Sequence, residues 1–252
     1  PLRRVTIGEA SDYLALRRTA APKMALATML CIFSPIALIG LAAVSELSAS
    51  AFPLREDVAA GIGLCALLIL VAIAVVLFLS CGNKAKEYEF LEKEPFETEY
   101  GVTGMVKERQ KAFKPTYDHM NTIGTVLCVL SFVPLFAVMA VRQDGFFMTM
   151  AVCLLLAVVG IGVYFFVYGG TIYSSMEKLL EEGDYTRREK SQKNITGPVS
   201  VIYWLVATAI FMIYTFGPKG NGQPRYSWII WAVAGVLYAA VLAGIKLIRN
   251  RK

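Results

Sequence analysis

The sequence contains Leu30-Cys31-Ile32-Phe33-Ser34-Pro35, and an altered copy, Leu127-Cys128-Val129-Leu130-Ser131-Phe132, follows 97 residues later. Each stretch lies inside a long apolar run. A second pair of similar stretches is Leu64-Cys65-Ala66-Leu67-Leu68 and, 88 residues later, Val152-Cys153-Leu154-Leu155-Leu156. Two matched pairs in the same order are typical of an internal repeat. We therefore interpret residues 24–94 and 121–182 as a duplication of one apolar hairpin with a polar tail.

Six almost uncharged runs dominate the sequence, which is 56% hydrophobic and only 17% charged. Each run is close to the roughly 20 residues that cross a bilayer as a helix, and none alternates as a membrane strand does. The sequence therefore predicts an all-α polytopic membrane protein whose six transmembrane helices form three hairpins. The predicted spans, which together make up the transmembrane domain 24–247, are residues 24–44, 58–80, 121–141, 146–168, 198–216 and 227–247.

Lys and Arg are concentrated on one side of these runs. Alternate connecting segments, with Lys246 counted in the last, contain 21 of these residues, against 4 in the segments between them. Cytoplasmic connections of membrane proteins are enriched in Lys and Arg. We therefore expect a multi-pass protein of the cytoplasmic (plasma) membrane with both termini inside. The helical loops 81–120 and 169–197 and the basic tail 248–252 would lie on the same side.

Residues 1–23 are predicted to form a cytoplasmic juxtamembrane amphipathic helix. Thr6 and Glu9 fit a capping box at its start, with Ile7, Ala10, Tyr13 and Leu14 on or beside one apolar face. Because the chain starts at Pro1 and not at Met, we expect either a processed segment or a further domain before it. In the second case the same helix would be a rigid connector from that domain to the first span. Three basic residues near the first span are candidates for contact with anionic headgroups of the lipid bilayer. They are Arg17, Arg18 and Lys23.

Each repeat carries a candidate hinge in its first span. Pro35 lacks a backbone donor, and the hydroxyl of Ser34 is placed to bond a carbonyl that the proline frees. Ser131 and Pro134 have similar places in the second copy, although the proline is displaced. These residues predict either kinks that serve helix packing alone or symmetry-related hinges beside a pocket.

The third hairpin is aromatic. Tyr203 and Trp204 are expected toward the inner interface, and Trp228 and Trp231 toward the outer one. The last span also carries small residues every four positions, a stripe that favours packing within the chain and leaves a homodimer as the alternative. The stripe consists of Gly235, Ala239 and Ala243.

Loop 81–120 combines an acidic cluster, from Glu87 to Glu99, with a basic helical stretch over 104–114. We expect a solvated helical hairpin in which these two groups of charges pair. A docking surface for a cytoplasmic partner or a cation is the alternative.

The cores of the six runs contain no Asp, Glu, Lys, Arg or His. Ion-driven transporters and intramembrane enzymes usually need such groups at membrane depth. The five cysteines form no CxxC pair, and His119 is the only histidine, which argues against a zinc or haem site. We therefore expect no catalytic residue, no metal, no cofactor and no enzyme activity.

The sequence also contains Leu180-Glu181-Glu182-Gly183-Asp184-Tyr185 and Ser227-Trp228-Ile229-Ile230-Trp231-Ala232-Val233-Ala234-Gly235-Val236-Leu237. Together with the Tyr13-Leu14 helix and the two Cys-Ser stretches, they resemble the membrane domain of certain regulators from Firmicutes and related bacteria. In that family the domain follows a phage-repressor-type (XRE-like) helix-turn-helix, which these 252 residues do not contain. The family's Ser-Pro and Trp-Pro pairs are replaced here by Ser131-Phe132 and Trp231-Ala232.

The resemblance implies a membrane anchor and sensor domain of a membrane-bound transcriptional regulator. A fused or associated N-terminal DNA-binding domain would contact the nucleic acid, and this chain would not. A ligand or the state of the membrane would change the packing of the bundle. The alternative is a small transporter or channel for an apolar or amphiphilic compound, which the duplicated hairpins and paired prolines favour.

Overall fold

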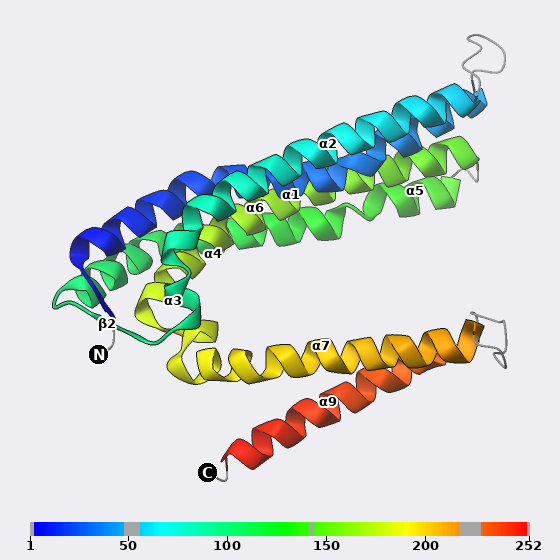
Figure 1. Ribbon diagram of the computed structural model, residues 1–252. Coiled ribbons are helices and arrows are strands. Elements are labelled where there is room, and N and C mark those ends of the chain that lie inside the picture. The colour runs from blue at the N-terminus through cyan, green and yellow to red at the C-terminus, as the bar shows by residue number, and fades with distance from the viewer. Residues whose placement is uncertain (1–2, 48–55, 142–143, 217–227, 251–252) are drawn as a thin grey trace. The chain divides into compact units, whose positions relative to one another are not determined.

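The computed structural model describes residues 3–47, 56–141, 144–216 and 228–250 (Figure 1). Nearly all of them are helical, and the chain divides into unit 1, Pro1–Tyr185, and unit 2, Thr186–Lys252. In the part described, five helices are long and apolar enough to cross a membrane, and a sixth apolar helix, Ile229–Gly244, is shorter. The predicted helical class is confirmed. Residue 227 of the last predicted span and residues 251–252 of the predicted tail lie outside the described ranges.

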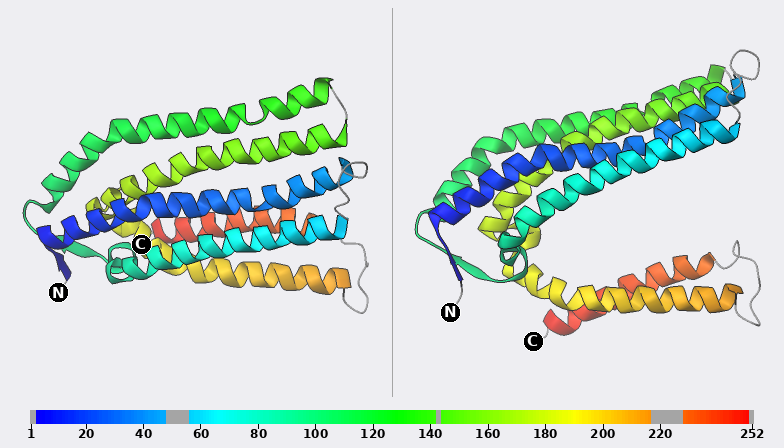
Figure 2. Two further views of the ribbon diagram at one scale, coloured as in Figure 1. Left: turned by 90° about the horizontal axis from the view of Figure 1, so that it is seen from above. Right: turned by 45° about the horizontal axis from the view of Figure 1, so that its top comes forward.

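Unit 1 consists of long helices that lie side by side in the order α4, α6, α1, α2 (Figure 2). Helix α1 packs against both α2 and α6, and α6 packs against α4 and α5. The two central helices, α1 and α6, therefore join the two stretches predicted to be repeats. The bounds are α1 (Ile7–Leu47), α2 (Glu56–Ala85), α4 (Val102–Leu130), α5 (Val133–Val141) and α6 (Gly145–Leu180).

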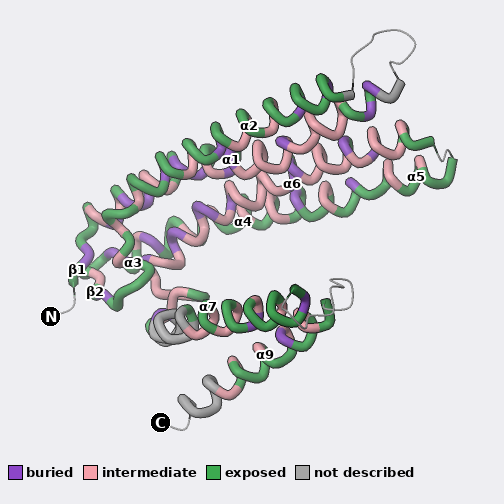
Figure 3. The backbone as a smooth tube through the Cα atoms, turned by 45° about the vertical axis from the view of Figure 1, so that its right-hand side comes forward, coloured by how far each residue is buried: buried purple, intermediate pink, exposed green. Residues whose placement is uncertain are grey.

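The outer helices of unit 1 leave large apolar side chains exposed over much of their length (Figure 3). On α2, for example, Ile69 is 60% exposed and Val76 is 65% exposed. Apolar area in water is costly, at roughly 25 cal/mol per Å², whereas lipid tails accept it without that cost. This pattern agrees with helices that face lipid.

Helix α6 approaches α4 and α1 at glycines. A Cβ added at Gly124 of α4 would lie 2.9 Å from the backbone oxygen of Gly162 of α6, and one at Gly162 would lie 3.0 Å from that of Gly124. A Cβ at Gly160 of α6 would clash with the ring of Phe33 of α1. Small residues permit such close packing between membrane helices. The sequence analysis placed a stripe of small residues in the last span and missed these contacts.

One end of unit 1 carries two short strands, β1 (Arg3–Val5) and β2 (Phe96–Thr98). They pair in parallel, with Arg3 opposite Phe96 and Val5 opposite Thr98. The all-α class is confirmed, and this strand pair is a small addition that the sequence did not predict. Strands of three residues are too short to show an alternating pattern in the sequence, and this pairing joins residues more than ninety positions apart.

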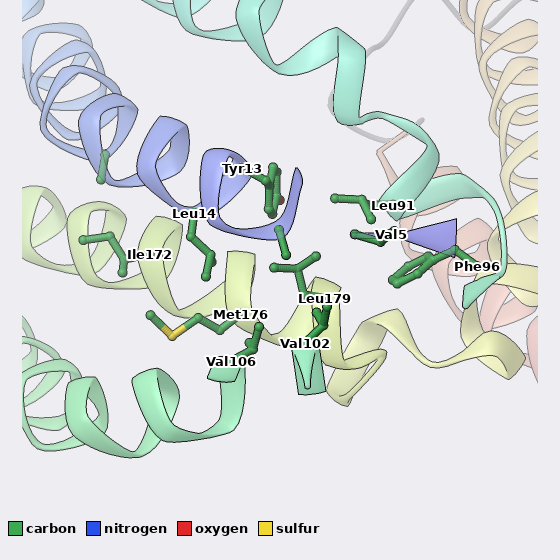
Figure 4. Packing of buried hydrophobic residues seen from close by; sticks show 12 residues of the cluster. Val5, Tyr13, Leu14, Leu91, Phe96, Val102, Val106, Ile172, Met176 and Leu179 are labelled. Carbon is green, nitrogen blue, oxygen red and sulfur yellow. The ribbon is translucent and has the colours of Figure 1, made fainter. Parts of the chain in front are cut away.

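A cluster of buried hydrophobic residues fills this end of unit 1 (Figure 4). We call this cluster the polar-end core, because it lies at the end of the unit that carries the polar loop 81–120. It combines β1, the first turns of α1 and α4, the short helix α3 (Phe90–Lys93), β2 and the last turns of α6. Loop 81–120 thus packs against the ends of α1 and α6 and is not a solvated hairpin. The members of the cluster are Val5, Ala10, Tyr13, Leu14, Ala21, Leu91, Phe96, Val102, Val106, Ile172, Met176 and Leu179.

The acidic cluster of loop 81–120 pairs differently from the prediction. Glu92 accepts from Lys178 of α6 at 2.7 Å, and Glu97 lies 3.8 Å from Arg4 of β1. Lys107, from the basic stretch, lies 3.9 Å from Glu182 beyond the end of α6. The expected partners differ because residues 104–114 form the start of α4, which packs against α6.

Unit 2 is a pair of helices, α7 (Arg187–Phe216) and α9 (Ile229–Asn250), joined by an aromatic interface. The rings of Trp204 and Trp231 stack with their centroids 5.9 Å apart. The hydroxyl of Tyr203 donates to the carbonyl of Ala234 at 2.5 Å. Trp204 and Trp231 therefore meet at one level, and their predicted separation into an inner and an outer belt is wrong.

The stripe of small residues on α9 does not face α7. Ala239 and Ala243 are exposed within unit 2, and a Cβ at Gly235 would meet no atom within 4 Å. Its use in packing, whether within the chain or in a homodimer, stays a prediction.

Candidate functional site

The start of α1 is fixed by reciprocal capping bonds. The Thr6 backbone N–H donates to Glu9 Oε2 at 3.0 Å, and the Glu9 backbone N–H donates to Thr6 Oγ1 at 3.2 Å. The bond from the Thr6 N–H lowers the pKa of Glu9. The predicted capping box is confirmed. The sequence analysis missed Glu99, whose carboxylate accepts the Ile7 N–H at 3.3 Å and ties this helix to the segment after β2.

The face of α1 that packs into the polar-end core is close to the predicted one. Ala10, Tyr13 and Leu14 are buried, at 0%, 3% and 6% exposure. Ile7 is 44% exposed, so its assignment to this face is wrong. Ile7 is the first residue of the helix, where the chain has just left β1. The helix continues to Leu47 without a break, through the predicted juxtamembrane segment and the first predicted span.

Arg17, Arg18 and Lys23, predicted as one headgroup contact, lie on three different sides of α1. Arg18 lines a cavity with α4 and α6, and Arg17 lines another with α2 and the residues that follow it. Lys23 faces Lys84 of α2. Consecutive helical residues are about 100° apart, so Arg17 and Arg18 cannot share a face. Contact of the three with headgroups stays a prediction.

The largest of these three cavities, which we call the two-arginine cavity, has a volume of about 670 Å³. Arg18 of α1 and Arg109 of α4 contribute its positive charges, and both residues are exposed. The walls are mostly apolar, with Phe113 from α4 and Ile172 and Met176 from α6. Its volume falls in the range, roughly 300–1,000 Å³, of cavities that bind small molecules.

Sequence reasoning missed Arg109, although a signal for the α6 wall was present. Tyr168, Ile172 and Met176 recur every four residues, which places them on one side of a helix. Arg109 and Phe113 have the same spacing on α4. Nothing in these spacings says that the two faces meet Arg18 of α1.

A smaller cavity of about 250 Å³ lies between α1, the end of α2 and α6. Arg17, Glu92 and Lys178 line it, and Glu92 is already paired with Lys178. The Nε of Arg17 is buried and has no hydrogen-bond partner among the described residues. The cavity thus has mixed charge.

The candidate hinge of α1 has the bond that the sequence predicts. Ser34 is 5% exposed, and its hydroxyl donates to the Cys31 carbonyl at 2.8 Å. In an α-helix the N–H of residue 35 would bond this carbonyl, but proline has no N–H. Ser34 therefore supplies the donor that Pro35 lacks, and α1 stays helical through it.

The second candidate hinge shares the serine bond but not the proline geometry. Ser131 is 1% exposed and donates to the Cys128 carbonyl at 2.7 Å. The N–H of Phe132 turns to Val129 O at 3.4 Å, so the chain leaves the helical pattern, and α5 begins at Val133. Pro134 is then the second residue of α5, near the helix start where a proline is tolerated. The helix is thus continuous at the serine of the first copy and broken at the serine of the second copy.

The Ser34 bond predicts a double-mutant result. We expect Ser34→Ala to lower the free energy of unfolding of unit 1 by about 0.5–2 kcal/mol, because it leaves the half-buried Cys31 carbonyl unpaired. In a Pro35→Ala background the same change should cost much less, because alanine restores the N–H to that carbonyl. Thermal unfolding read with a thiol-reactive dye checks both, since all five cysteines belong to unit 1. Equal costs in the two backgrounds would contradict the assigned role.

Negative charge gathers where α6 ends. Burial, together with the nearby carboxylates of Asp184 and Glu182, raises the pKa of Glu177 above its ordinary value. Glu181 has a positive φ of 50°, and Glu182 donates its N–H back to the Glu177 carbonyl at 3.0 Å. This turn holds the carboxyl groups close together at the end of the helix.

The raised pKa of Glu177 sets the sign of a pH effect. The folded state binds this proton more tightly than the unfolded state, so stability falls as pH rises from the ordinary value of 4.5 through the raised pKa. We expect Glu177→Gln to raise the unfolding midpoint at pH 7 by roughly 1–3 °C and to flatten this fall. Thermal unfolding with the thiol-reactive dye between pH 4 and pH 8 is the measurement. The matched change Glu108→Gln, at an exposed position on α4, should leave the profile unchanged.

In the described ranges, no group of three or more His, Cys, Asp or Glu side chains is placed to hold a metal ion. No family model matches this sequence, and no curated protein and no solved structure matches it.

Proposed function

We propose that this chain is a non-catalytic membrane anchor and sensor domain, in which a ligand or the state of the bilayer changes the packing of the helices. Its six spans would form three hairpins in the cytoplasmic membrane, the first two of them an internal duplication, with α9 as the core of the sixth and both termini inside. The observation that carries the proposal is the path of α1. One helix runs from the polar-end core to Leu47 without interruption.

Helix α1 supports the proposal because both of its ends contact other elements of unit 1. A change in the packing at one end would therefore be passed along the helix to the other. Its capped start is bonded to Glu99, and β1, directly before it, pairs with β2. Its apolar part packs against α2 and α6 and carries the buried Ser34, followed by the half-buried Pro35. A shift of α1 against α6 would therefore change the position of β1 and of anything attached to it.

The proposed output is a DNA-binding domain, fused or associated at the N-terminus, as the resemblance to membrane-bound regulators implies. This chain itself would contact lipid and that domain, not nucleic acid. The distribution of Lys and Arg supports the orientation, since the polar-end core and the two long loops, which contain twelve of these residues, would then share the cytoplasmic side with this domain.

A small transporter or channel for an apolar or amphiphilic compound is the second candidate. The two-arginine cavity and the matched serine bonds of α1 and α4 favour it. The hairpins of the two repeats would have the same orientation, however, whereas many secondary transporters combine inverted repeats.

The test is a chromosomal replacement in the cells that produce the protein. Residues 24–247 are exchanged for an unrelated single-span anchor, and everything before residue 24 is kept. Transcript levels are then compared before and after a change of membrane lipid composition. We expect the transcriptional response of the original strain to be lost.

An unchanged response after this replacement would contradict the sensor. Movement of a fluorescent amphiphile across vesicle membranes by the purified full-length chain would support the transporter instead. As a matched control, Gly170→Ala in the intact chain should preserve the response, because a Cβ there would meet no atom within 4 Å.

A further inference from the structure

The two-arginine cavity is built from one face of each of three helices. Its lining residues recur at intervals of three or four along α1, α4 and α6, which is the spacing of a helix face. Just beyond the cavity, the rings of Tyr117 of α4 and Tyr173 of α6 stack 4.3 Å apart. The cavity is therefore a part of the packed unit and not a gap between mobile loops. The residues that matter for binding are Leu14, Arg18, Arg109, Phe113, Ile172 and Met176.

The positive charges of the cavity are not neutralised by the protein. Among the described residues, neither Arg18 nor Arg109 has a carboxylate within ion-pair distance. The basic groups nearby that do have partners, Lys107 and Lys178, bind Glu182 and Glu92. Two guanidinium groups that line one cavity without a counter-ion favour an anion, and their planar donor sets match phosphate oxygens.

The rest of the cavity suits a hydrocarbon chain. Phe113, Ile172 and Met176 offer apolar area, and Met adapts its shape to flexible ligands. A free phosphate ion would leave this area without a partner. A neutral lipid would leave both guanidinium groups without one.

The position of the cavity along the helices indicates where such a molecule would come from. Arg18 lies six residues before the first predicted span, and Tyr168, which also lines the cavity, is the last residue of the fourth. The cavity thus begins at the level where the fourth span would leave the bilayer and extends from there to the cytoplasmic side, because Arg109 lies twelve residues before the third predicted span. Anionic lipid headgroups occupy this level, and arginine side chains reach it from helix ends.

We propose that the two-arginine cavity binds an anionic amphiphile, with a phosphate monoester headgroup between Arg18 and Arg109 and an acyl chain against Phe113, Ile172 and Met176. The regulatory meaning of this site rests on the proposed sensor function. A headgroup held by both arginines would tie α1 to α4 across α6, and so would fix the position of α1. The abundance of such lipids would then be the signal.

Binding is tested with the purified full-length chain in dodecyl maltoside micelles, by native mass spectrometry and by titration. The probes are oleoyl lysophosphatidic acid, its neutral counterpart monoolein, and inorganic phosphate. We expect one lysophosphatidic acid per chain, and binding at least about tenfold weaker for Arg18→Gln/Arg109→Gln. Monoolein and inorganic phosphate should each bind at least about tenfold more weakly than lysophosphatidic acid.

Lys111→Gln is the matched control, because it removes a positive charge from an exposed position on α4 that does not line the cavity. Its affinity should equal that of the original chain. An equal loss for Lys111→Gln and for the double variant would overturn the site, since binding would then follow net charge alone. If monoolein bound as tightly as lysophosphatidic acid, the role of the arginines would be overturned. If inorganic phosphate bound as tightly, the site would be one for anions, and the role of the acyl chain would be overturned.

A second variant addresses the apolar wall. Ala112 lines the cavity, and Ala112→Leu adds volume there while both arginines are retained. We expect it to weaken lysophosphatidic acid binding at least about threefold and to leave the unfolding midpoint within about 2 °C. Unchanged binding would overturn the placement of the acyl chain.

Binding and regulation fail separately in these experiments. If lysophosphatidic acid binds as described but the anchor replacement leaves transcription unchanged, the site stands and the sensor function is wrong. If transcription depends on the bundle but the double arginine variant binds normally, the sensor stands and the site is wrong.

Discussion

Gly162→Ala should destabilise unit 1 by about 1–3 kcal/mol, although alanine is the better helix former. The new Cβ would lie 2.9 Å from Cys128 Sγ and 3.0 Å from the backbone oxygen of Gly124. A backbone oxygen cannot rotate away as a side chain can, so α4 and α6 must separate. We expect thiol-reactive dye to label the unit at a lower temperature, because the half-buried Cys128 lies at this approach and becomes more exposed when the two helices separate.

Gly170→Ala is the matched control on the same helix. A Cβ at position 170 would meet no atom within 4 Å, so the gain in helix propensity, roughly 0.5–1 kcal/mol, should appear alone. The two substitutions are chemically identical and should have opposite signs. A stabilising Gly162→Ala would show that α4 and α6 do not approach as closely as the structure has them.

Phe96→Ala should open the polar-end core while the apolar parts of the helices stay packed. Phe96 is 1% exposed and meets the ring of Phe90 edge-on, with centroids 6.4 Å apart. Removing a buried phenylalanine side chain costs about 3–5 kcal/mol, from lost burial and the cavity left behind. Hydrogen exchange of the backbone amides of β1, β2 and the first turn of α1 measures this local opening.

Tyr100→Ala is the control for that prediction, because Tyr100 follows β2 closely and is 99% exposed. It should change exchange in the polar-end core by less than about 0.5 kcal/mol. Faster exchange over α1, α2 and α6 alike in Phe96→Ala would contradict a core that opens by itself. The tryptophans all belong to unit 2, so unchanged tryptophan fluorescence would show that unit 2 is unaffected.

Some features of the two-arginine cavity are visible in the sequence, and others appear only in the folded unit. Arg18 was singled out from its place before the first span, and it lines the two-arginine cavity, while its contact with headgroups stays a prediction. Arg109 was counted only as a member of a basic stretch expected to pair with acidic residues. Its place in the same cavity as Arg18 depends on α4 and α1 both packing against α6, and no local pattern encodes that.

Sequence alone determined the features that depend on neighbours three or four residues apart. The long apolar runs, the capping box of Thr6 and Glu9, and the Ser34 bond to Cys31 all belong to this class, because a helix brings such residues together by its own geometry. The end of α6 shortly before Gly183 follows from the same local chemistry.

Tertiary structure alone decided the contacts between residues far apart along the chain. The pairing of β1 with β2, the approach of Gly124 to Gly162 and the lining of one cavity by Arg18 and Arg109 each join different elements. Apolar periodicity tells which residues leave water or face lipid, but not which partner they meet. That choice depends on which side chains fit together when all the helices pack, and it is a property of the assembled unit.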